Sequence, residues 1–273
     1  MSQWTAFEVT VADHVAEVTL IGPGKGNAMG PDFWRELPEV FAELDADTEV
    51  RAVVLAGRGK HFSFGLDLSA MAGELGPVLA GDALAKTRTE FHRMVLRMQG
   101  ATTAVARSRT PVVAVIQGWC IGGGVDLIAA ADIRYASADA TFSVREAKVG
   151  MVADMGSLQR LPAIIGDAHT RELAFTAKDI DADAALRINL VNDVLPDADA
   201  ALATARATAA QIAANPPLVV QGVKDVLDWP LTGTVDDGLR YVAAWNAAFL
   251  PSKDIGEAIS AIFEKRPPSF TGE

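Results

Sequence analysis

Three consecutive glycines stand ahead of an acidic residue in the apolar stretch CIGGGVDLI, residues 120–128. Glycine lets the backbone approach a ligand that any Cβ would block, and the first amides of a following helix have no partner within that helix. Such amides stabilise a developing oxyanion, so Gly122–Gly124 suit a carbonyl group that becomes enolate-like. The structural alternative is that these glycines only let a strand and a helix pack closely.

A second glycine-bearing loop, GKHFSFGLDL at residues 59–68, follows another apolar stretch. Gly65 can turn a backbone amide outward in the same way, so the two loops together predict an oxyanion hole with two amide donors. We interpret Asp67 as a loop residue with a structural hydrogen bond. Phe64 and Trp119 are expected to be pocket walls or core residues.

The surrounding sequence predicts the elements that position these loops. Apolar residues alternate with polar ones on both sides of residues 13–14, which predicts a β-hairpin. The apolar runs 52–56 and 112–116 indicate buried strands, and each leads into one of the glycine loops. Helical spacing predicts helices over residues 33–44 and 91–105. Alternating strands and helices indicate an α/β core whose loops gather at the carboxyl ends of parallel strands, where ligands bind.

The pattern continues with a predicted short helix from Gly124 to about Ala131 and with strand-like segments at 133–135 and 141–143. Beyond Pro196 the composition changes to alanine-rich segments that favour helices. Three helices are predicted there, over residues 198–214, 218–228 and 235–249. Several apolar residues at the end of the chain are expected to form a contact surface: Trp245, Phe249, Ile255, Ile259 and Phe263.

Composition narrows the class of protein. A chain of 273 residues, half of them hydrophobic, can form one large domain or a domain with an appendage. A net charge of -11 argues against nucleic acid or an anionic membrane as a partner. The single cysteine, Cys120, fits a reducing compartment, and the N-terminal segment lacks the pattern of a secretory signal. We therefore expect a cytoplasmic protein without membrane spans.

Several other chemistries lack their sequence motifs. The four histidines are scattered and the chain has no cysteine cluster, so no metal site is expected. The segment 22–26 lacks the spacing of a phosphate-binding loop, and the GxSxG motif of serine hydrolases is absent. The GxGxxG motif of dinucleotide sites is missing from the turn at Gly122.

Three segments together carry a resemblance to a known family: GKHFSFGLDLSAM, PVVAVIQGWCIGGGVDLIAAADIRYASADATFSVREAKVG and GSLQRLPAIIG. They resemble the enoyl-CoA hydratase/isomerase family, also called the crotonase family. The similarity is collinear over about residues 5–270, and the ending FEKRPPSFTG is also similar to that of the family. This combination is far more specific than any single glycine motif.

The resemblance implies a fold and a substrate class. It implies an α/β spiral core of repeated ββα units with the active site over residues 1–196, and a helical region over residues 197–273 for trimerisation and active-site cover. The implied substrate is an acyl-CoA thioester, and no cofactor is expected beyond the coenzyme A that the substrate carries. The implied assembly is a homotrimer or a dimer of trimers.

By position, the two oxyanion-hole amides of the family fall on Leu66 and Gly123. Lys25 is a candidate for the coenzyme A phosphates, although an exposed surface lysine is the usual alternative. The remaining residues expected to contact substrate lie in or near the two loops: Phe64, Gly65, Asp67, Trp119 and Gly122.

Three acidic residues indicate which reaction to expect. Hydratases of the family activate water with two glutamates, and this chain has Asp126 and Glu146 there. Aspartate is one methylene shorter, which would set its carboxylate back by roughly 1.5 Å and puts water activation in doubt. A third acid, Asp154, stands where typical hydratases have the glycine of a Pro-Gly pair. This triple resembles the Δ3,5-Δ2,4-dienoyl-CoA isomerase branch, which removes a proton at C2 and delivers one at C6.

The chemistry explains why two separate carboxyl groups would be useful. A 1,5 proton shift spans several bonds, so Glu146 is expected to be the base at C2 and Asp154 the acid at C6. Asp126 would orient or polarise its neighbours. Crowded carboxyl groups in an apolar pocket are not all ionised near neutrality, so an acid and a base can coexist.

Other interpretations stay open from the sequence. A 2-enoyl-CoA hydratase or another isomerase of the family would use Asp126 and Glu146. A non-catalytic acyl-CoA-binding or assembly protein would keep only the fold. Taken singly, Asp126 is also explained as a charge favoured by a helix N-terminus, Glu146 as a surface ion pair beside Arg145 and Lys148, and Asp154 as the cap of a helix near Ser157.

Overall fold

The computed structural model describes residues 3–80, 84–228, 235–249 and 252–273. The strands are β1 (Phe7–Ala12), β2 (Val15–Leu20), β3 (Ala52–Gly57), β4 (Val112–Ile116), β5 (Trp119–Ile121), β6 (Ile133–Ser137), β7 (Thr141–Ser143), β8 (Ile180–Asp181) and β9 (Asp193–Leu195). The helices are α1 (Pro31–Ala46), α2 (Ala72–Leu79), α3 (Ala85–Arg107), α4 (Gly123–Ala129), the 3₁₀ helix η1 (Glu146–Val149), α5 (Ser157–Thr176), α6 (Ala182–Arg187), α7 (Ala198–Ala213), α8 (Pro217–Asp228), α9 (Val235–Phe249) and α10 (Lys253–Glu264).

A six-stranded sheet in the order β1-β2-β3-β4-β6-β9 forms the centre of the molecule. β1 and β2 form the predicted hairpin, which turns at Asp13 and His14 with φ values of 48° and 65°. Every other neighbouring pair of this sheet is parallel. A smaller sheet, β5-β7-β8, is reached as the chain leaves β4 and β6, so it lies at the carboxyl ends of the parallel strands.

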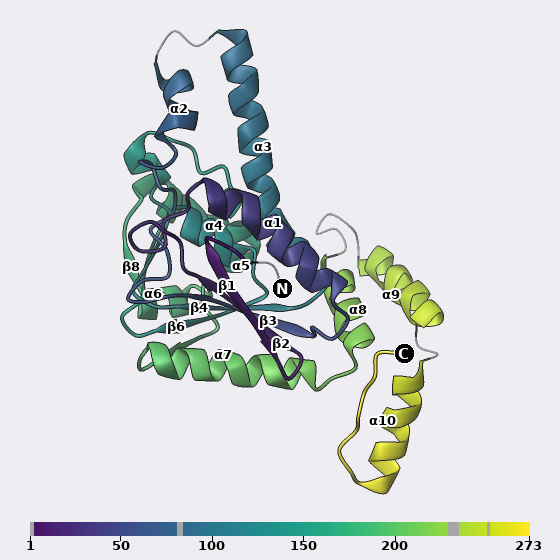
Figure 1. Cartoon of the computed structure of the whole chain (residues 1–273). Coiled ribbons are helices and arrows are strands. Elements are labelled where there is room, and N and C mark those ends of the chain that lie inside the picture. The colour runs from purple at the N-terminus through teal and green to yellow at the C-terminus, as the bar shows by residue number, and fades with distance from the viewer. Residues whose placement is uncertain (1–2, 81–83, 229–234, 250–251) are drawn as a thin grey trace.

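Helices cover both faces of the large sheet (Figure 1). α1 and α3 lie on one face, and α7 lies on the other with its alanines Ala201, Ala205 and Ala209 packed against β3 and β4. Strands covered on both faces read as continuous apolar runs, which explains AVVLAG in β3 and VVAVI in β4. The fold class predicted from the sequence, a mixed α/β core followed by helices, matches this architecture.

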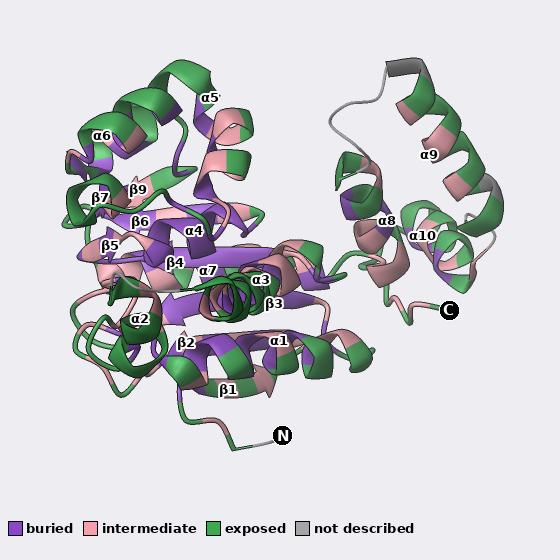
Figure 2. Ribbon diagram, turned by 90° about the horizontal axis from the view of Figure 1, so that it is seen from above, coloured by how far each residue is buried: buried purple, intermediate pink, exposed green. Residues whose placement is uncertain are grey.

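The helical region expected from residue 197 has two parts in the structure. α7 belongs to the layer that covers the sheet. α8, α9 and α10 stand to one side of the core (Figure 2). A role in subunit contact is therefore expected only of the part after α7.

The structure also adds elements that sequence patterns missed. α2 has no buried residues and was not predicted, and α3 begins six residues before the predicted start at Phe91. The buried residues of α3 run from Met94 to Val105, so hydrophobic periodicity marked only the half that packs on the core. The other half of α3 rises out of the body beside α2 (Figure 1).

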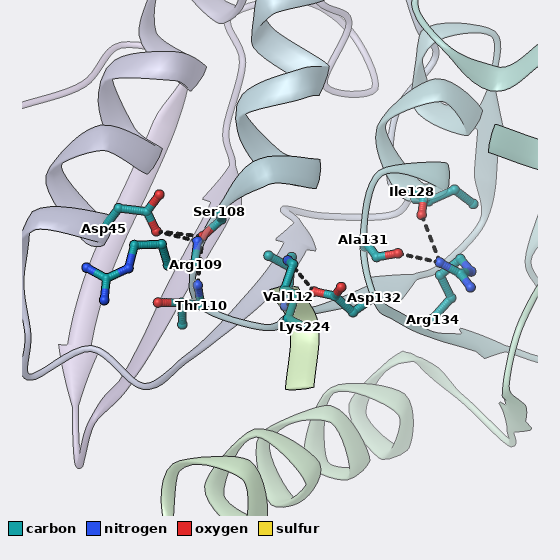
Figure 3. Close-up of polar contacts among 10 residues, drawn as sticks. All are labelled: Asp45, Ser108, Arg109, Thr110, Val112, Ile128, Ala131, Asp132, Arg134 and Lys224. Atoms are coloured by element: carbon teal, nitrogen blue, oxygen red, sulfur yellow. Dashed lines mark hydrogen bonds and ion pairs between the residues drawn. The ribbon is translucent and has the colours of Figure 1, made fainter. Parts of the chain in front are cut away.

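Polar contacts hold the amino ends of the central strands (Figure 3). Asp132 accepts hydrogen bonds from the Val112 amide at 2.7 Å and from Nζ of Lys224 at 2.8 Å, which ties α8 to the first residue of β4. The Arg134 guanidinium donates to the carbonyl oxygens of Ala131 at 2.6 Å and Ile128 at 3.3 Å. These carbonyls follow or end α4, so Arg134 satisfies groups that a helix C-terminus leaves unpaired.

Candidate active site

The two glycine loops meet backbone to backbone at the carboxyl ends of β3 and β4. Gly65 has a φ of 75°, and a Cβ there would lie 2.6 Å from the Ile121 carbonyl oxygen and 2.9 Å from the Gly123 nitrogen. A Cβ on Gly123 would in turn lie 3.8 Å from the Leu66 nitrogen. The close approach therefore requires glycine at residue 65, and it brings the amides of Leu66 and Gly123 together.

Neither amide is used in holding the fold. In the described part of the chain, the parallel bridge beside Leu66 uses the amides of Met29 and Asp67 as donors, while Gly123 is the first residue of α4 and has no partner within the helix. Leu66 and Gly123 both line one cavity. Two free donors that face a shared space have the arrangement of an oxyanion hole.

Glu146 lies beside this pair, at the start of η1. A Cβ on Gly122 would lie 3.2 Å from Oε1 of Glu146, and Oε2 is buried without a hydrogen-bond partner among the described residues. Burial, followed by the charge of Asp126, raises the pKa of Glu146 to about 7. A carboxyl group with this pKa is ionised in about half of the molecules at neutrality, as a general base requires.

The ion-pair interpretation of Glu146 does not match the structure. Its neighbour Arg145 instead contacts Asp179 at 2.5 Å, with its guanidinium 5.7 Å from the centre of the Trp119 ring. The carboxyl group of Glu146 therefore remains available to a ligand in the cavity that Glu146 lines.

Asp126 is buried, with 1% of its surface exposed, and its carboxylate has a structural partner. Oδ1 accepts a hydrogen bond of 2.6 Å from the amide of Ser157, the first residue of α5. Burial raises the pKa of Asp126 to about 6, against the lowering effect of the bonds from Ser157. Asp126 thus holds the start of α5, and its charge raises the pKa of Glu146; the orienting role expected of it stays a prediction.

Asp154 lies in the loop between η1 and α5 and is exposed, more so than the sequence interpretation implied. Two residues of α3 hold this loop: Nε2 of Gln99 donates to the Asp154 carbonyl at 2.8 Å, and Oγ1 of Thr102 donates to the Met155 carbonyl at 2.7 Å. Partial burial raises the pKa of the Asp154 carboxyl group. The cap interpretation is not met, because Asp126, not Asp154, accepts from Ser157.

One largely apolar cavity brings the predicted groups together. Asp126, Glu146 and Asp154 line it with the oxyanion-hole residues Leu66 and Gly123. The rest of its lining is hydrophobic and comes mainly from α3 and the loop before α5: Trp34, Leu75, Phe91, Met94, Val95, Met98, Met151, Val152 and Met155. A second cavity shares Leu66, Gly123 and Glu146 with the first, and Phe64, Gly122 and Arg145 are among its other lining residues.

The remaining predicted contacts separate into two groups. Phe64 and Gly122 line the second cavity, and Gly65 shapes the loop. Asp67 accepts a hydrogen bond of 2.9 Å from the Ala70 amide, which is the structural bond expected of it. Trp119 and Lys25 line neither of these two cavities, and contact of these residues with substrate stays a prediction.

Sequence reasoning missed the part of the site that α3 contributes. The spacing of Phe91, Met94, Val95 and Met98 predicted a helix but gave no sign that its apolar face lines the cavity. Gln99 and Thr102 carried no motif, because their role depends on a loop that lies 53 or more residues away in the chain.

The described residues contain no group of three or more His, Cys, Asp and Glu side chains placed to hold a metal ion. Among the helices that the structure describes, none is long and apolar enough to cross a membrane.

Comparisons with known proteins show similarity over most of the chain. The family model for enoyl-CoA hydratase/isomerase matches residues 10–273. The chain is 44% identical over 259 residues to a protein of Dictyostelium discoideum named mitochondrial Delta(3,5)-Delta(2,4)-dienoyl-CoA isomerase, covering 94% of this chain and 87% of that one. It is 32% identical over 253 residues to a short-chain-enoyl-CoA hydratase of Clostridium acetobutylicum, with 92% of each chain covered.

The fold agrees as well. A crystal structure titled as a putative enoyl-CoA hydratase from Streptomyces coelicolor superposes with a TM-score of 0.89 at 30% identity, covering 100% of this chain and 96% of that one. The predicted crotonase-like fold class is therefore confirmed. The chain is a member of the enoyl-CoA hydratase/isomerase family.

Proposed function

We propose that the protein isomerises 3,5-dienoyl-CoA to 2,4-dienoyl-CoA. The observation that carries the proposal is that Glu146 and Asp154 line the same cavity as Leu66 and Gly123, whose amides have no partner among the described residues. The similarity to the Dictyostelium discoideum protein named as such an isomerase supports it.

The reaction follows from these groups. The thioester oxygen accepts hydrogen bonds from the amides of Leu66 and Gly123, which stabilise the negative charge that develops there. The Glu146 carboxylate removes a proton from C2, and the electron pair is delocalised over the thioester oxygen and the two double bonds as a conjugated trienolate. The Asp154 carboxyl group then donates its proton to C6, and the double bonds are left at C2 and C4.

The two cavities suggest how the substrate lies. The apolar cavity with its methionines would take the acyl chain, because thioether side chains adapt to flexible apolar ligands. The second cavity, on the other side of Leu66 and Gly123, would take the thiol end of coenzyme A. No cofactor beyond the coenzyme A of the substrate enters the proposed reaction.

Hydration of 2-enoyl-CoA is the second candidate, since a relative is named as such a hydratase. Asp126 bears against it, because its carboxylate is bonded to Ser157 instead of standing free beside Glu146 to share a water molecule. The third alternative, a non-catalytic acyl-CoA-binding protein, keeps the cavity without turnover.

One assay separates the three. Purified protein is offered a medium-chain 3,5-dienoyl-CoA and, separately, crotonyl-CoA, and the absorbance of the conjugated 2,4-diene is followed. Formation of the diene at a rate far above hydration supports the isomerase. Hydration of crotonyl-CoA without diene formation rejects it, and a thermal shift with acyl-CoA but no turnover of either substrate favours a binding protein.

We also infer that α8–α10 form the subunit interface of a homotrimer or a dimer of trimers. α10 carries the exposed apolar residues Ile255, Ile259, Ile262 and Phe263, more than an isolated helix surface usually presents. Light scattering of the whole chain tests this assembly. The cytoplasmic location expected from the sequence stays a prediction, and the matched Dictyostelium discoideum protein is named as mitochondrial.

A further inference from the structure

Asp154 lies on a wall between two hollows of the molecule. One is the apolar cavity that it shares with Glu146. The other is a cleft of about 370 Å³, which shares only Asp154 and Met155 with the apolar cavity. Besides Asp154, this cleft is lined by Gln99, Thr103, Met155, Gly156, Gln159 and Arg160.

The proposed isomerisation leaves the enzyme in the wrong protonation state. The proposed reaction starts from an ionised Glu146 and a protonated Asp154. After turnover Glu146 holds the proton taken from C2, and Asp154 has lost its own proton to C6. The next turnover requires that Glu146 release one proton and Asp154 gain one, either by transfer between the two groups or by exchange with water.

From this arrangement, and resting on the proposed function, we propose that the cleft lined by Gln99, Thr103, Gln159 and Arg160 is the route by which water returns a proton to Asp154. Water in the cleft donates to the Asp154 carboxylate. Glu146 gives its proton to water through the second cavity once the product has left, so no net proton is consumed.

The cleft is suited to this task by its position and its lining. An acyl chain in the apolar cavity would leave the cleft free for water, because Gln99, Thr103, Gln159 and Arg160 do not line that cavity. Its volume greatly exceeds the space of one water molecule, about 30 Å³, and its amide, hydroxyl and guanidinium groups can hold water in place.

The loop that separates the hollows is held so that the cleft remains open. Gln99 and Thr102 bind the carbonyl groups of Asp154 and Met155 on the α3 side. Arg160, a residue of α5, donates a hydrogen bond of 3.4 Å to the Met155 carbonyl. The Asp154 side chain is therefore reached from both sides of a fixed loop.

The first test follows the hydrogen that arrives at C6. The wild-type protein is given 3,5-dienoyl-CoA that carries two deuterium atoms at C2, in ordinary water, and the product is analysed by NMR. The proposal expects C6 to receive hydrogen from water in nearly every turnover. Appearance of the C2 deuterium at C6 over many turnovers would mean direct transfer from Glu146 to Asp154 and would overturn it.

The second test obstructs the cleft. Thr103→Leu and Gln159→Leu replace polar lining groups with apolar ones, and Thr89→Leu, on the exposed part of the same helix α3, is the matched control. The first turnover of the cleft variants is expected to keep its wild-type rate, because Asp154 starts protonated. Later turnovers are expected to slow by about tenfold, which gives a burst of one product per site.

The outcomes distinguish the proposal from structural damage and from failure of the proposed function. A damaged fold slows the first turnover as well and produces no burst. Wild-type kinetics without a burst in both cleft variants would overturn the proton route while the isomerase assignment stands. Absence of diene formation by the wild-type protein would instead reject the assignment itself.

Discussion

The two ends of the central sheet differ in whether their polar groups have hydrogen-bond partners within the protein. At the amino ends of the strands, Asp132 bonds to Val112 and Lys224, and Arg134 closes the end of α4. At the carboxyl ends, the amides of Leu66 and Gly123 and Oε2 of Glu146 are left without partners among the described residues. Unpaired buried groups destabilise a fold. Nε of Arg51 at the amino end of β3 is also buried without a partner, but the three groups at the carboxyl ends line one cavity, where a ligand is expected to pair with them.

The comparison gives a general expectation for substitutions. Changes at the amino ends should lower stability and leave turnover per folded molecule unchanged. Changes at the carboxyl ends should alter turnover and either leave stability unchanged or increase it. The predictions below test this division in order of decreasing effect.

Glu146→Gln is expected to lower kcat for isomerisation by about 10³-fold, because the amide cannot take the proton from C2. The melting temperature is expected to stay close to that of the wild type, since Oε2 has no bond to lose. Steady-state assays and thermal unfolding measure the two quantities. Glu172→Gln, an exposed change on α5, is the matched control, and an equal loss of activity in that variant would contradict the assignment.

The activity should depend on pH through the same group. Glu146 acts in its ionised form, and its pKa is raised to about 7, so kcat/KM should fall by about 50-fold between pH 7 and pH 5. Burial also raises the pKa of Asp154, so the apparent pKa values of the profile belong to the coupled carboxyl groups and not to Glu146 alone. A profile that is flat from pH 5 to pH 7 would show that Glu146 is not the base.

Asp132→Ala tests the other end of the sheet. It removes the acceptor of Val112 and leaves Lys224 buried without its ion pair, so the free energy of unfolding should fall by about 2 kcal/mol. Urea unfolding at a fixed protein concentration measures this loss. Turnover by the folded protein should equal that of the wild type, and a lower kcat would break the division between the two ends.

Asp126→Asn is expected to give the smallest and least intuitive effect. Burial raises the pKa of Asp126 from 3.8 to about 6, so the folded state binds a proton more tightly than the unfolded chain and loses stability as pH rises between these values. The asparagine can still accept from Ser157 without carrying a buried charge. The variant should therefore be more stable than the wild type at pH 8, by about 1 kcal/mol, and lose this advantage at pH 3.5.

Measurement of unfolding at both pH values separates this effect from a general change in packing. A gain of the same size at pH 3.5 and pH 8 would contradict the linkage to Asp126. A loss of stability at pH 8 would show that the charged bond to Ser157 outweighs the desolvation of the carboxylate.

Local patterns were enough to predict much of the fold. The hairpin of β1 and β2 and the strands β3 and β4 follow from alternation and from continuous apolar runs, which depend only on neighbouring residues. α2 and the protruding half of α3 were missed because they bury little surface and show no periodicity. Short strands such as β8 depend on pairing across the fold, which no local pattern records.

The site divides in the same way. The two glycine loops predicted a close backbone approach. The family resemblance pointed to Asp126, Glu146 and Asp154, which the structure brings to one cavity. The partners that fix these groups, such as Ser157 for Asp126 and Gln99 for the Asp154 loop, come from distant segments. Lys25 and Trp119 line neither of the two cavities, and no local pattern records in which direction a side chain points.

The donors proposed to hold the thioester oxygen belong to the main chain at Leu66 and Gly123. A peptide N–H does not titrate, and no exchange of side chain, except to proline, deletes it. Point mutations therefore rarely remove the two amides that bind the enolate, whereas the acidic side chains of the cavity can be exchanged or moved to other positions. New reactions can thus arise on this scaffold while the enolate of the thioester is still stabilised. In that sense the backbone changes less than the side chains when the reaction changes.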